Sequence, residues 1–157
     1  MKKLRSWLLI VMIGITACEG PMGPQGPPGR DAAETQWWLL DFTVTRQMWE
    51  LIGDPNDIGS FYRCVFDVPD LSTAIYNDGG IFCNYRYKDD FGDDVQTPLP
   101  FTYYDIDIRD GVEFPFAVQI SYDVTPGSVA FKLVFSDFYT GDFDPPALCK
   151  FRMNLVY

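Results

Sequence analysis

From residue 35 onward, apolar and polar positions alternate with a period of two along much of the chain. In a β-strand successive side chains point to opposite faces, so this period predicts strands with one buried and one solvent-facing side. The alternation is most regular in residues 116–124, 129–135 and 149–157. Less regular apolar segments predict further strands at residues 37–45, 48–52, 61–68, 81–88 and 102–108.

Short segments rich in Gly, Pro, Asn and Asp separate these stretches, at residues 53–56, 77–80, 98–100, 110–111 and 126–127. These residue types favour turns over continued strands. Seven or eight short strands without a long helical pattern predict an all-β fold. We expect an antiparallel two-sheet β-sandwich over residues 35–157, with one short helical turn between Pro69 and Ile75.

The first 18 residues have the pattern of an export signal. A positive segment with Lys2, Lys3 and Arg5 precedes an apolar run at residues 7–15, which is too short to span a bilayer. The run ends in Ile-Thr-Ala-Cys, which resembles the lipobox of bacterial lipoproteins. We therefore expect residues 1–17 to be a lipoprotein signal peptide and Cys18 to be lipidated with acyl chains such as palmitate. The alternative is an ordinary signal peptide cleaved after Ala17.

Lipidation would determine how the chain is held in the cell envelope. Two or three acyl chains, at ~0.8 kcal/mol per buried methylene, hold a protein at a membrane effectively permanently, whereas a single chain does not. The membrane would then be a partner through the lipid on Cys18 rather than through the protein surface.

Residues 19–34 form a predicted stalk or linker. Four consecutive Gly-X-Y triplets with four prolines run from Gly20 to Asp31. Glycine at every third position is what a collagen triple helix requires, and proline favours polyproline II. As a single chain these 12 residues would be a semi-rigid spacer of about 37 Å. As three chains they would make the protein a trimer. The short repeat favours the monomer.

Charge and composition exclude several functional classes. The chain has 12 basic and 22 acidic residues. Removal of the leader takes away three basic residues, which leaves nine basic and 22 acidic side chains and a net charge of −13. Nucleic acid is therefore not an expected partner. The absence of histidine removes the commonest general base and metal ligand. We expect no enzymatic activity and no cofactor other than the calcium considered below.

The whole arrangement resembles a family of outer-membrane lipoproteins in Bacteroidota, which combine a lipobox, collagen-like triplets and a small β domain. The similar segments are residues 37–44, 61–69, 96–100 and 126–131. The resemblance implies a lipid-anchored protein of the outer membrane, but it implies no molecular function. Only Glu19 precedes the glycines as an acidic residue. A surface-facing and a periplasm-facing domain both remain open.

One candidate site is a cluster of carboxylates at Asp89, Asp90, Asp93 and Asp94, around Gly92. Clustered oxygen ligands on a loop are typical of calcium sites. The string does not fit an EF-hand, however. The alternative interpretation is a solvated turn in an acidic protein.

A second candidate is an aromatic platform for a glycan, formed by Trp37, Trp38, Tyr103 and Tyr104. Adjacent residues of a strand cannot both point inward, so one ring of each pair is expected to be exposed or at a sheet edge. The alternative is that these rings cover an end of the sandwich.

Three cysteines remain if Cys18 is lipidated, and each lies on the apolar side of a predicted strand. Cys64 and Cys83 are the closest pair along the chain and could form a disulfide in an exported protein, which would leave Cys149 as an odd thiol. The alternative is that all three are small buried side chains.

These observations predict a non-catalytic, lipid-anchored lipoprotein that displays a β-sandwich for binding or envelope assembly. An outer-membrane protein is one expected partner, for example in a nutrient-uptake complex of the starch-utilisation type. The alternatives are a glycan-binding surface lipoprotein, a trimeric structural or adhesive lipoprotein, and a small hydrolase that uses paired carboxylates.

Overall fold

The computed structural model describes residues 35–55, 57, 59–136 and 144–157. The chain divides into two units, residues 1–33 and 34–157, and every described residue belongs to the second. The predicted signal peptide, Cys18 and the collagen-like stalk therefore lie outside the described residues. In the part that is described, no helix is both long and apolar enough to cross a membrane.

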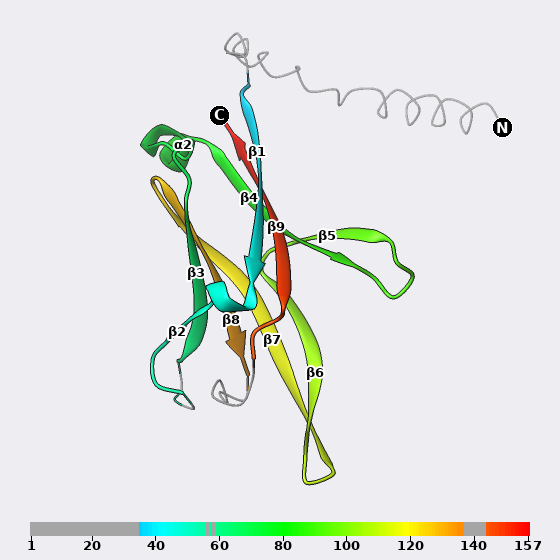
Figure 1. The fold of residues 1–157 in the computed structure, drawn as a ribbon. Helices are drawn as coiled ribbons and strands as arrows, with labels where there is room; N and C mark the ends of the chain where they lie inside the picture. Colours follow the sequence, from blue (N-terminus) through cyan, green and yellow to red (C-terminus); the bar gives the residue numbers. More distant parts are fainter. Residues whose placement is uncertain (1–34, 56, 58, 137–143) are drawn as a thin grey trace, which may run out of the picture. The chain divides into compact units, whose positions relative to one another are not determined.

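The described residues contain nine strands in two antiparallel sheets (Figure 1). The four-stranded sheet has the order β1 (Trp37–Thr45), β9 (Leu148–Val156), β4 (Gly80–Lys88) and β5 (Asp94–Pro98). The five-stranded sheet has the order β2 (Glu50–Ile52), β3 (Phe61–Asp67), β8 (Ser128–Phe135), β7 (Val112–Thr125) and β6 (Phe101–Arg109). The all-β fold and its two antiparallel sheets are thus as predicted, with nine strands in place of seven or eight.

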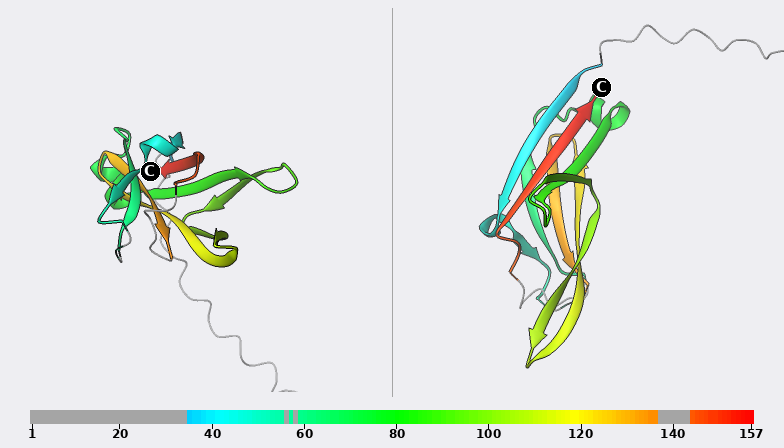
Figure 2. Two further views of the ribbon diagram at one scale, coloured as in Figure 1. Left: turned by 60° about the horizontal axis from the view of Figure 1, so that its bottom comes forward. Right: turned by 90° about the vertical axis from the view of Figure 1, so that its right-hand side faces the viewer.

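The two sheets pack face to face as a sandwich (Figure 2), because each contributes its apolar face to one core. Phe131 of β8 stacks on Phe151 of β9 with ring centroids 4.0 Å apart, and both side chains are fully buried. Phe42 of β1 packs against Phe66 of β3, with ring centroids 5.0 Å apart. Burial of one phenylalanine side chain contributes about 1.5–3 kcal/mol, so these rings between the sheets are a main source of stability.

The strand β5 was not predicted, because its residues lie between two segments rich in turn-forming residues. In the described part of the chain it pairs only with β4, from Lys88↔Asp94 to Asn84↔Pro98. Proline has no N–H to donate and is tolerated at the edge of a sheet, which is where Pro98 lies. The turn-forming residues on either side therefore lie at the ends of a short edge strand and do not form one continuous loop.

The one α-helix among the described residues, α2 (Thr73–Asp78), begins later than the helical turn predicted for residues 69–75. The side-chain oxygen of Ser72 accepts a hydrogen bond of 3.2 Å from the backbone N–H of Ile75. This is an N-cap, which satisfies one of the free N–H groups of the first turn and sets the start of the helix. A 3-10 turn, η1 (Arg46–Met48), follows β1 and shortens the strand predicted at residues 48–52 to β2.

Two hairpins extend beyond the sandwich (Figures 1 and 2). One is β4–β5. The other is the outer part of β6–β7, because β8 ends at Phe135, opposite Val118. Within the described residues, the strand segments from Asp105 to Phe116 pair only with each other. We call residues 105–116 the β6–β7 ribbon. Its exposed apolar side chains are Ile106, Ile108, Val112 and Phe114.

Candidate functional site

The structure separates the two members of each predicted aromatic pair, as the alternation of a strand requires. Trp37 is 68% exposed, whereas Trp38 packs against the core. Tyr104 is 81% exposed, whereas Tyr103 packs against the core and stacks on Phe101 with centroids 6.0 Å apart. Of these four residues, Trp37 and Tyr104 are therefore the two that offer a ring to a ligand.

These two exposed rings do not form one platform. Trp37 lies on the outer face of the four-stranded sheet, in β1, and Tyr104 lies on the outer face of the five-stranded sheet, in β6. The outer faces of a sandwich point in opposite directions. A single glycan cannot contact both rings, so the four aromatic residues proposed from the sequence do not make one site.

The four carboxylates at residues 89–94 lie at the turn between β4 and β5. The Asp89 carboxylate accepts hydrogen bonds from the backbone N–H groups of Phe91 and Asp93, at 3.0 and 2.9 Å. Lys88 donates to the carbonyl oxygen of Gly92 at 3.0 Å and pairs with Asp94 at 3.2 Å. These contacts close the turn. No group of three potential metal ligands converges among the described residues, so the calcium site remains a prediction from sequence.

The three thiols are free and buried in the structure. Cys64 belongs to the five-stranded sheet, and Cys83 and Cys149 belong to the four-stranded sheet. Burial raises the pKa of Cys83 to about 12 and that of Cys149 to about 11. The structure therefore has them as small core side chains, the second of the two interpretations left open by the sequence.

The outer face of the four-stranded sheet has a composition that the sequence did not reveal. The strand register sets side chains of β1, β9 and β4 in rows. In one row Leu39, Asn154 and Phe82 lie side by side, and in the preceding row Trp37 lies beside Val156. Leu39 and Phe82 are 64% and 59% exposed. We call Trp37, Leu39, Phe82 and Val156 the apolar half of this face.

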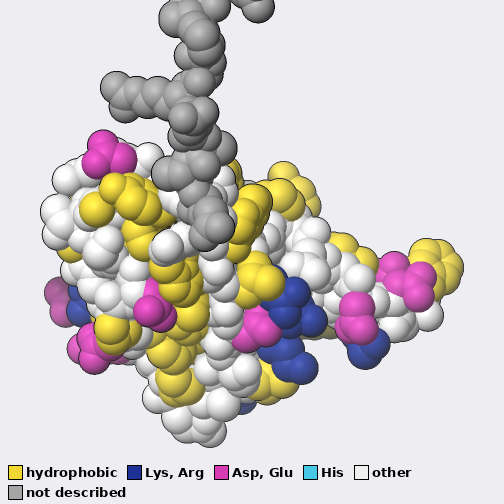
Figure 3. Space-filling view, turned by 90° about the horizontal axis from the view of Figure 1, so that it is seen from above, with side chains coloured by type: hydrophobic (Ala, Val, Ile, Leu, Met, Phe, Trp, Pro, Cys, Tyr) yellow, Lys and Arg dark blue, Asp and Glu magenta, His cyan; other side chains and the backbone are white. Residues whose placement is uncertain are grey.

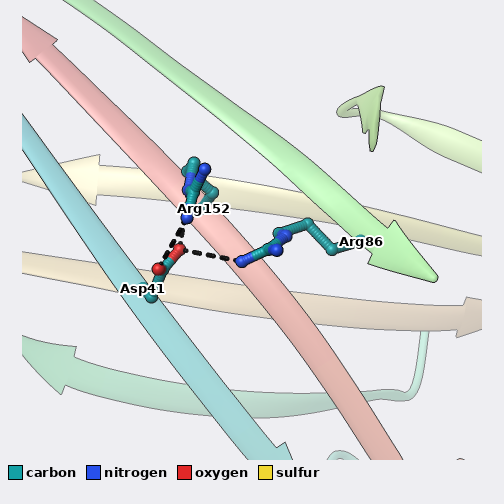
Figure 4. Close-up of polar contacts among 3 residues, drawn as sticks. All are labelled: Asp41, Arg86 and Arg152. Atoms are coloured by element: carbon teal, nitrogen blue, oxygen red, sulfur yellow. Dashed lines mark hydrogen bonds and ion pairs between the residues drawn. The ribbon is translucent and has the colours of Figure 1, made fainter. Parts of the chain in front are cut away.

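The next rows contain charged side chains, centred on Asp41 of β1 (Figure 4). Its two carboxylate oxygens accept hydrogen bonds from Nε and a terminal nitrogen of Arg152, both at 2.8 Å. Arg86 of β4 reaches the same carboxylate through one nitrogen at 3.4 Å. The hydrogen bonds from Arg152 hold the pKa of Asp41 below its usual range, and the charge of Arg86 adds to this. Two cations thus share one anion.

A further cation lies directly beside this cluster. Lys150 of β9 is opposite Arg86 in the register, and both belong to the outer face. Lys150 has no ion-pair partner within the described part of the chain. Like charges directly opposite each other on a sheet are destabilising. We call Asp41, Arg86, Lys150 and Arg152 the charged half of the face.

A shallow pocket of about 280 Å³ lies next to the charged half. It is lined by side chains of β4, β5 and the start of β9: Arg86, Tyr87, Lys88, Asp94, Val95, Leu148 and Lys150, together with Tyr85. Three of these residues are cations. Seen from above, Lys and Arg side chains gather on one side of the domain, with carboxylates and hydrophobic side chains next to them (Figure 3).

The sequence contained one signal for this face. Residues 37–40 are apolar without interruption, so both sides of β1 had to be apolar at that end. The remaining members could not be grouped from sequence, because they come from three strands that are far apart along the chain.

A scan of protein-family models, a search of curated proteins and a search of solved structures each returned no match to this chain. The function must therefore be argued from the residues themselves.

Proposed function

We propose that this protein is a non-catalytic, lipid-anchored lipoprotein of the outer membrane whose β domain binds a ligand on the outer face of the four-stranded sheet. The observation that supports this is the amphiphilic character of that face. An outer sheet face in water is normally polar. Here a cluster of exposed apolar side chains lies next to ordered, paired charges, which is typical of an interaction surface.

The geometry of the charged half supports binding over catalysis. Both oxygens of Asp41 accept hydrogen bonds from arginine, and its pKa is lowered. A carboxylate in this state is a poor general acid, because it remains ionised at neutral pH. The arrangement instead presents guanidinium and ammonium groups in fixed positions, which suits recognition of a ligand.

The attachment to the outer membrane rests on the sequence of residues 1–18. The lipobox-like segment ending at Cys18 and the resemblance to Bacteroidota lipoproteins support it. An acidic chain with a net charge of −13 after processing has little affinity for anionic lipid, so the acyl chains would hold it at the membrane. The collagen-like segment would then act as the spacer between the anchor and the binding domain.

Rebinding to cell envelopes tests the proposal. The chain from Glu19 contains every residue of the core, since all of these lie between residues 44 and 155. This soluble form should bind saturably to envelopes from cells that lack the protein. A Leu39→Ser, Phe82→Ser double variant should lose most of this binding, because both side chains lie in the apolar half. Tyr104→Ser, which changes an even more exposed ring on the other sheet, should bind like the unmodified chain.

Two outcomes would contradict the proposal. Unchanged binding by the double variant would remove the face from the function, and no binding by the unmodified chain would remove the binding role itself. The anchor has a separate check: Cys18→Ser should move the full-length protein out of the lipidated outer-membrane fraction.

A further inference from the structure

The distribution of cations in the domain is uneven. Residues 35–157 contain eight basic and 19 acidic side chains. Four of the eight basic residues lie on two neighbouring strands of the four-stranded sheet: Arg86, Lys88, Lys150 and Arg152. The ion pairs within the described residues give this group only two carboxylates, Asp41 and Asp94. The group therefore has two more cations than ion-paired carboxylates, in a domain that is otherwise strongly acidic.

This concentration of cations has a cost that a ligand would offset. Arg86 and Lys150 lie directly opposite each other across β4 and β9, in a position where like charges repel. Arg86 contacts Asp41 at only 3.4 Å and through one nitrogen. A planar guanidinium and an ammonium group side by side are suited to one anionic group, which the guanidinium can bind through two N–H donors.

The remainder of the face is suited to a sugar chain. The Phe82 ring lies close over Gly80, where a β-carbon would come within 2.9 Å of the ring. Part of the ring thus lies close to the backbone of Gly80, and the side chain is still 59% exposed. Asn154 lies directly opposite this ring on β9, and Asn84 lies between Phe82 and Arg86 on β4. Their amides can both donate to and accept from hydroxyl groups.

The spacing indicates a ligand longer than one small group. Phe82 and Arg86 are four residues apart on β4, which is ~13 Å at the rise of a β-strand. A ligand that spans this distance has to offer apolar ring faces, hydroxyl groups and anionic groups along one chain. The shallow pocket beside Lys150, at about 280 Å³, is at the small end of ligand sites and suits a single residue of such a chain.

We propose that the outer face of the four-stranded sheet binds an anionic polysaccharide, with a carboxylate or sulfate group between Arg86 and Lys150 and a sugar ring on Phe82. This inference rests on the binding face proposed above and names the ligand class for it. An acidic peptide would satisfy the cations but would offer no sugar ring to Phe82.

Calorimetric titration of the full-length protein, purified in a neutral detergent, tests the inference. The probes are polygalacturonate, dextran sulfate, neutral dextran and polyglutamate. We expect binding to polygalacturonate, to dextran sulfate or to both, weakened by added salt, and no measurable binding to dextran. The charged probe that binds more tightly identifies carboxylate or sulfate as the preferred group. Binding to polyglutamate that equals binding to the sugars would overturn the glycan class.

Variants locate the site. Lys150→Gln should weaken binding by about fivefold, the upper end for an exposed ion pair. It should also melt at or above the temperature of the unmodified protein, because it removes the repulsion from Arg86. Phe82→Ala should weaken binding by a similar factor. Lys132→Gln makes the same charge change on the five-stranded sheet and should bind normally.

The two proposals can fail separately. Envelope rebinding that depends on Leu39 and Phe82, without binding to any anionic polysaccharide, would overturn the glycan inference and leave the binding module in place. Absence of envelope rebinding and of polysaccharide binding would overturn both the binding module and the glycan inference. Loss of glycan binding in Lys132→Gln as large as in Lys150→Gln would show that net charge and not this face is responsible, which also contradicts the inference.

Discussion

Cys83 and Cys149 point into the core from neighbouring strands of the four-stranded sheet, and both are almost completely buried. A thiolate in such a position would lose its hydration, so burial favours the protonated form. The effect raises the pKa from the ordinary value of 9.0 to about 12 for Cys83 and about 11 for Cys149. Burial also raises the pKa of Tyr103, from 10.0 to about 12, so its phenol remains protonated in the folded chain at a pH where it would ionise in the unfolded chain.

These raised pKa values predict a loss of stability in alkali. Below pH 9 the thiols are protonated in both the folded and the unfolded chain, so they make no pH-dependent contribution. Above pH 9 the unfolded chain releases protons that the native state retains, and the free energy of unfolding falls. At pH 10.5 we expect a loss of roughly 1–2 kcal/mol per thiol, measured by urea denaturation relative to pH 8.

A Cys83→Ala, Cys149→Ala double variant provides the control. It should start from a lower stability, because it removes buried atoms, but should lose less between pH 8 and pH 10.5 than the unmodified protein. Equal losses in both proteins would show that these thiols are not the source of the alkaline sensitivity.

At the scale of the strands, the alternation of apolar and polar residues was sufficient to predict a strand where one of its faces is buried and the other faces solvent. The strand β8 alternates between buried and half-buried positions throughout, and its predicted range, 129–135, differs from the observed one by a single residue. The strand β5 was missed because an edge strand with one neighbour has a weak burial pattern. The local signal thus depends on how strongly the rest of the fold covers each strand.

The stability of the β6–β7 ribbon also depends on how much of the fold covers it. Among the described residues, the strands of this ribbon have backbone partners only in each other, and a two-stranded ribbon is marginally stable in water. Residues 118–120 of β7 are paired on both sides, with β6 and with β8. Opening of the ribbon should therefore require less free energy than opening of the central part of β7.

Hydrogen exchange measures this difference directly. Backbone amides of the ribbon should exchange at least about tenfold faster than those of residues 118–120, which corresponds to an opening free energy lower by ~1.4 kcal/mol. The two segments belong to the same strand pair, so each is the internal control for the other. Equal protection would mean that another surface covers the ribbon, and its exposed Ile106 and Ile108 would then lie at an interface.

At the scale of the whole molecule, the candidate site depends on pairings that no local pattern contains. Asp41, Arg86 and Arg152 are separated by 45 residues or more, and they meet because β9 lies between β1 and β4. The sequence could identify polar positions on wet faces, but it could not determine which strands are neighbours or in what register. A shift of one residue in β9 would turn Lys150 and Arg152 toward the core.

The number of chains in the functional unit is the remaining property at this scale, and it depends on residues 20–31. Four Gly-X-Y triplets give a triple helix few cooperative contacts. The domain also carries a large negative net charge, so three copies held side by side would repel each other. We therefore expect the soluble chain from Glu19 to sediment as a monomer at low salt.

A glycine substitution distinguishes a single-chain spacer from a triple helix. Only glycine fits at the axis of a triple helix, so Gly26→Ala would disrupt a trimer and would leave a single-chain spacer unchanged. Analytical ultracentrifugation should give the same monomer mass for the unmodified chain and for Gly26→Ala. A trimer that becomes a monomer in the Gly26→Ala variant would contradict the spacer role, and it would favour the structural or adhesive alternative, in which three binding faces act together with correspondingly higher avidity.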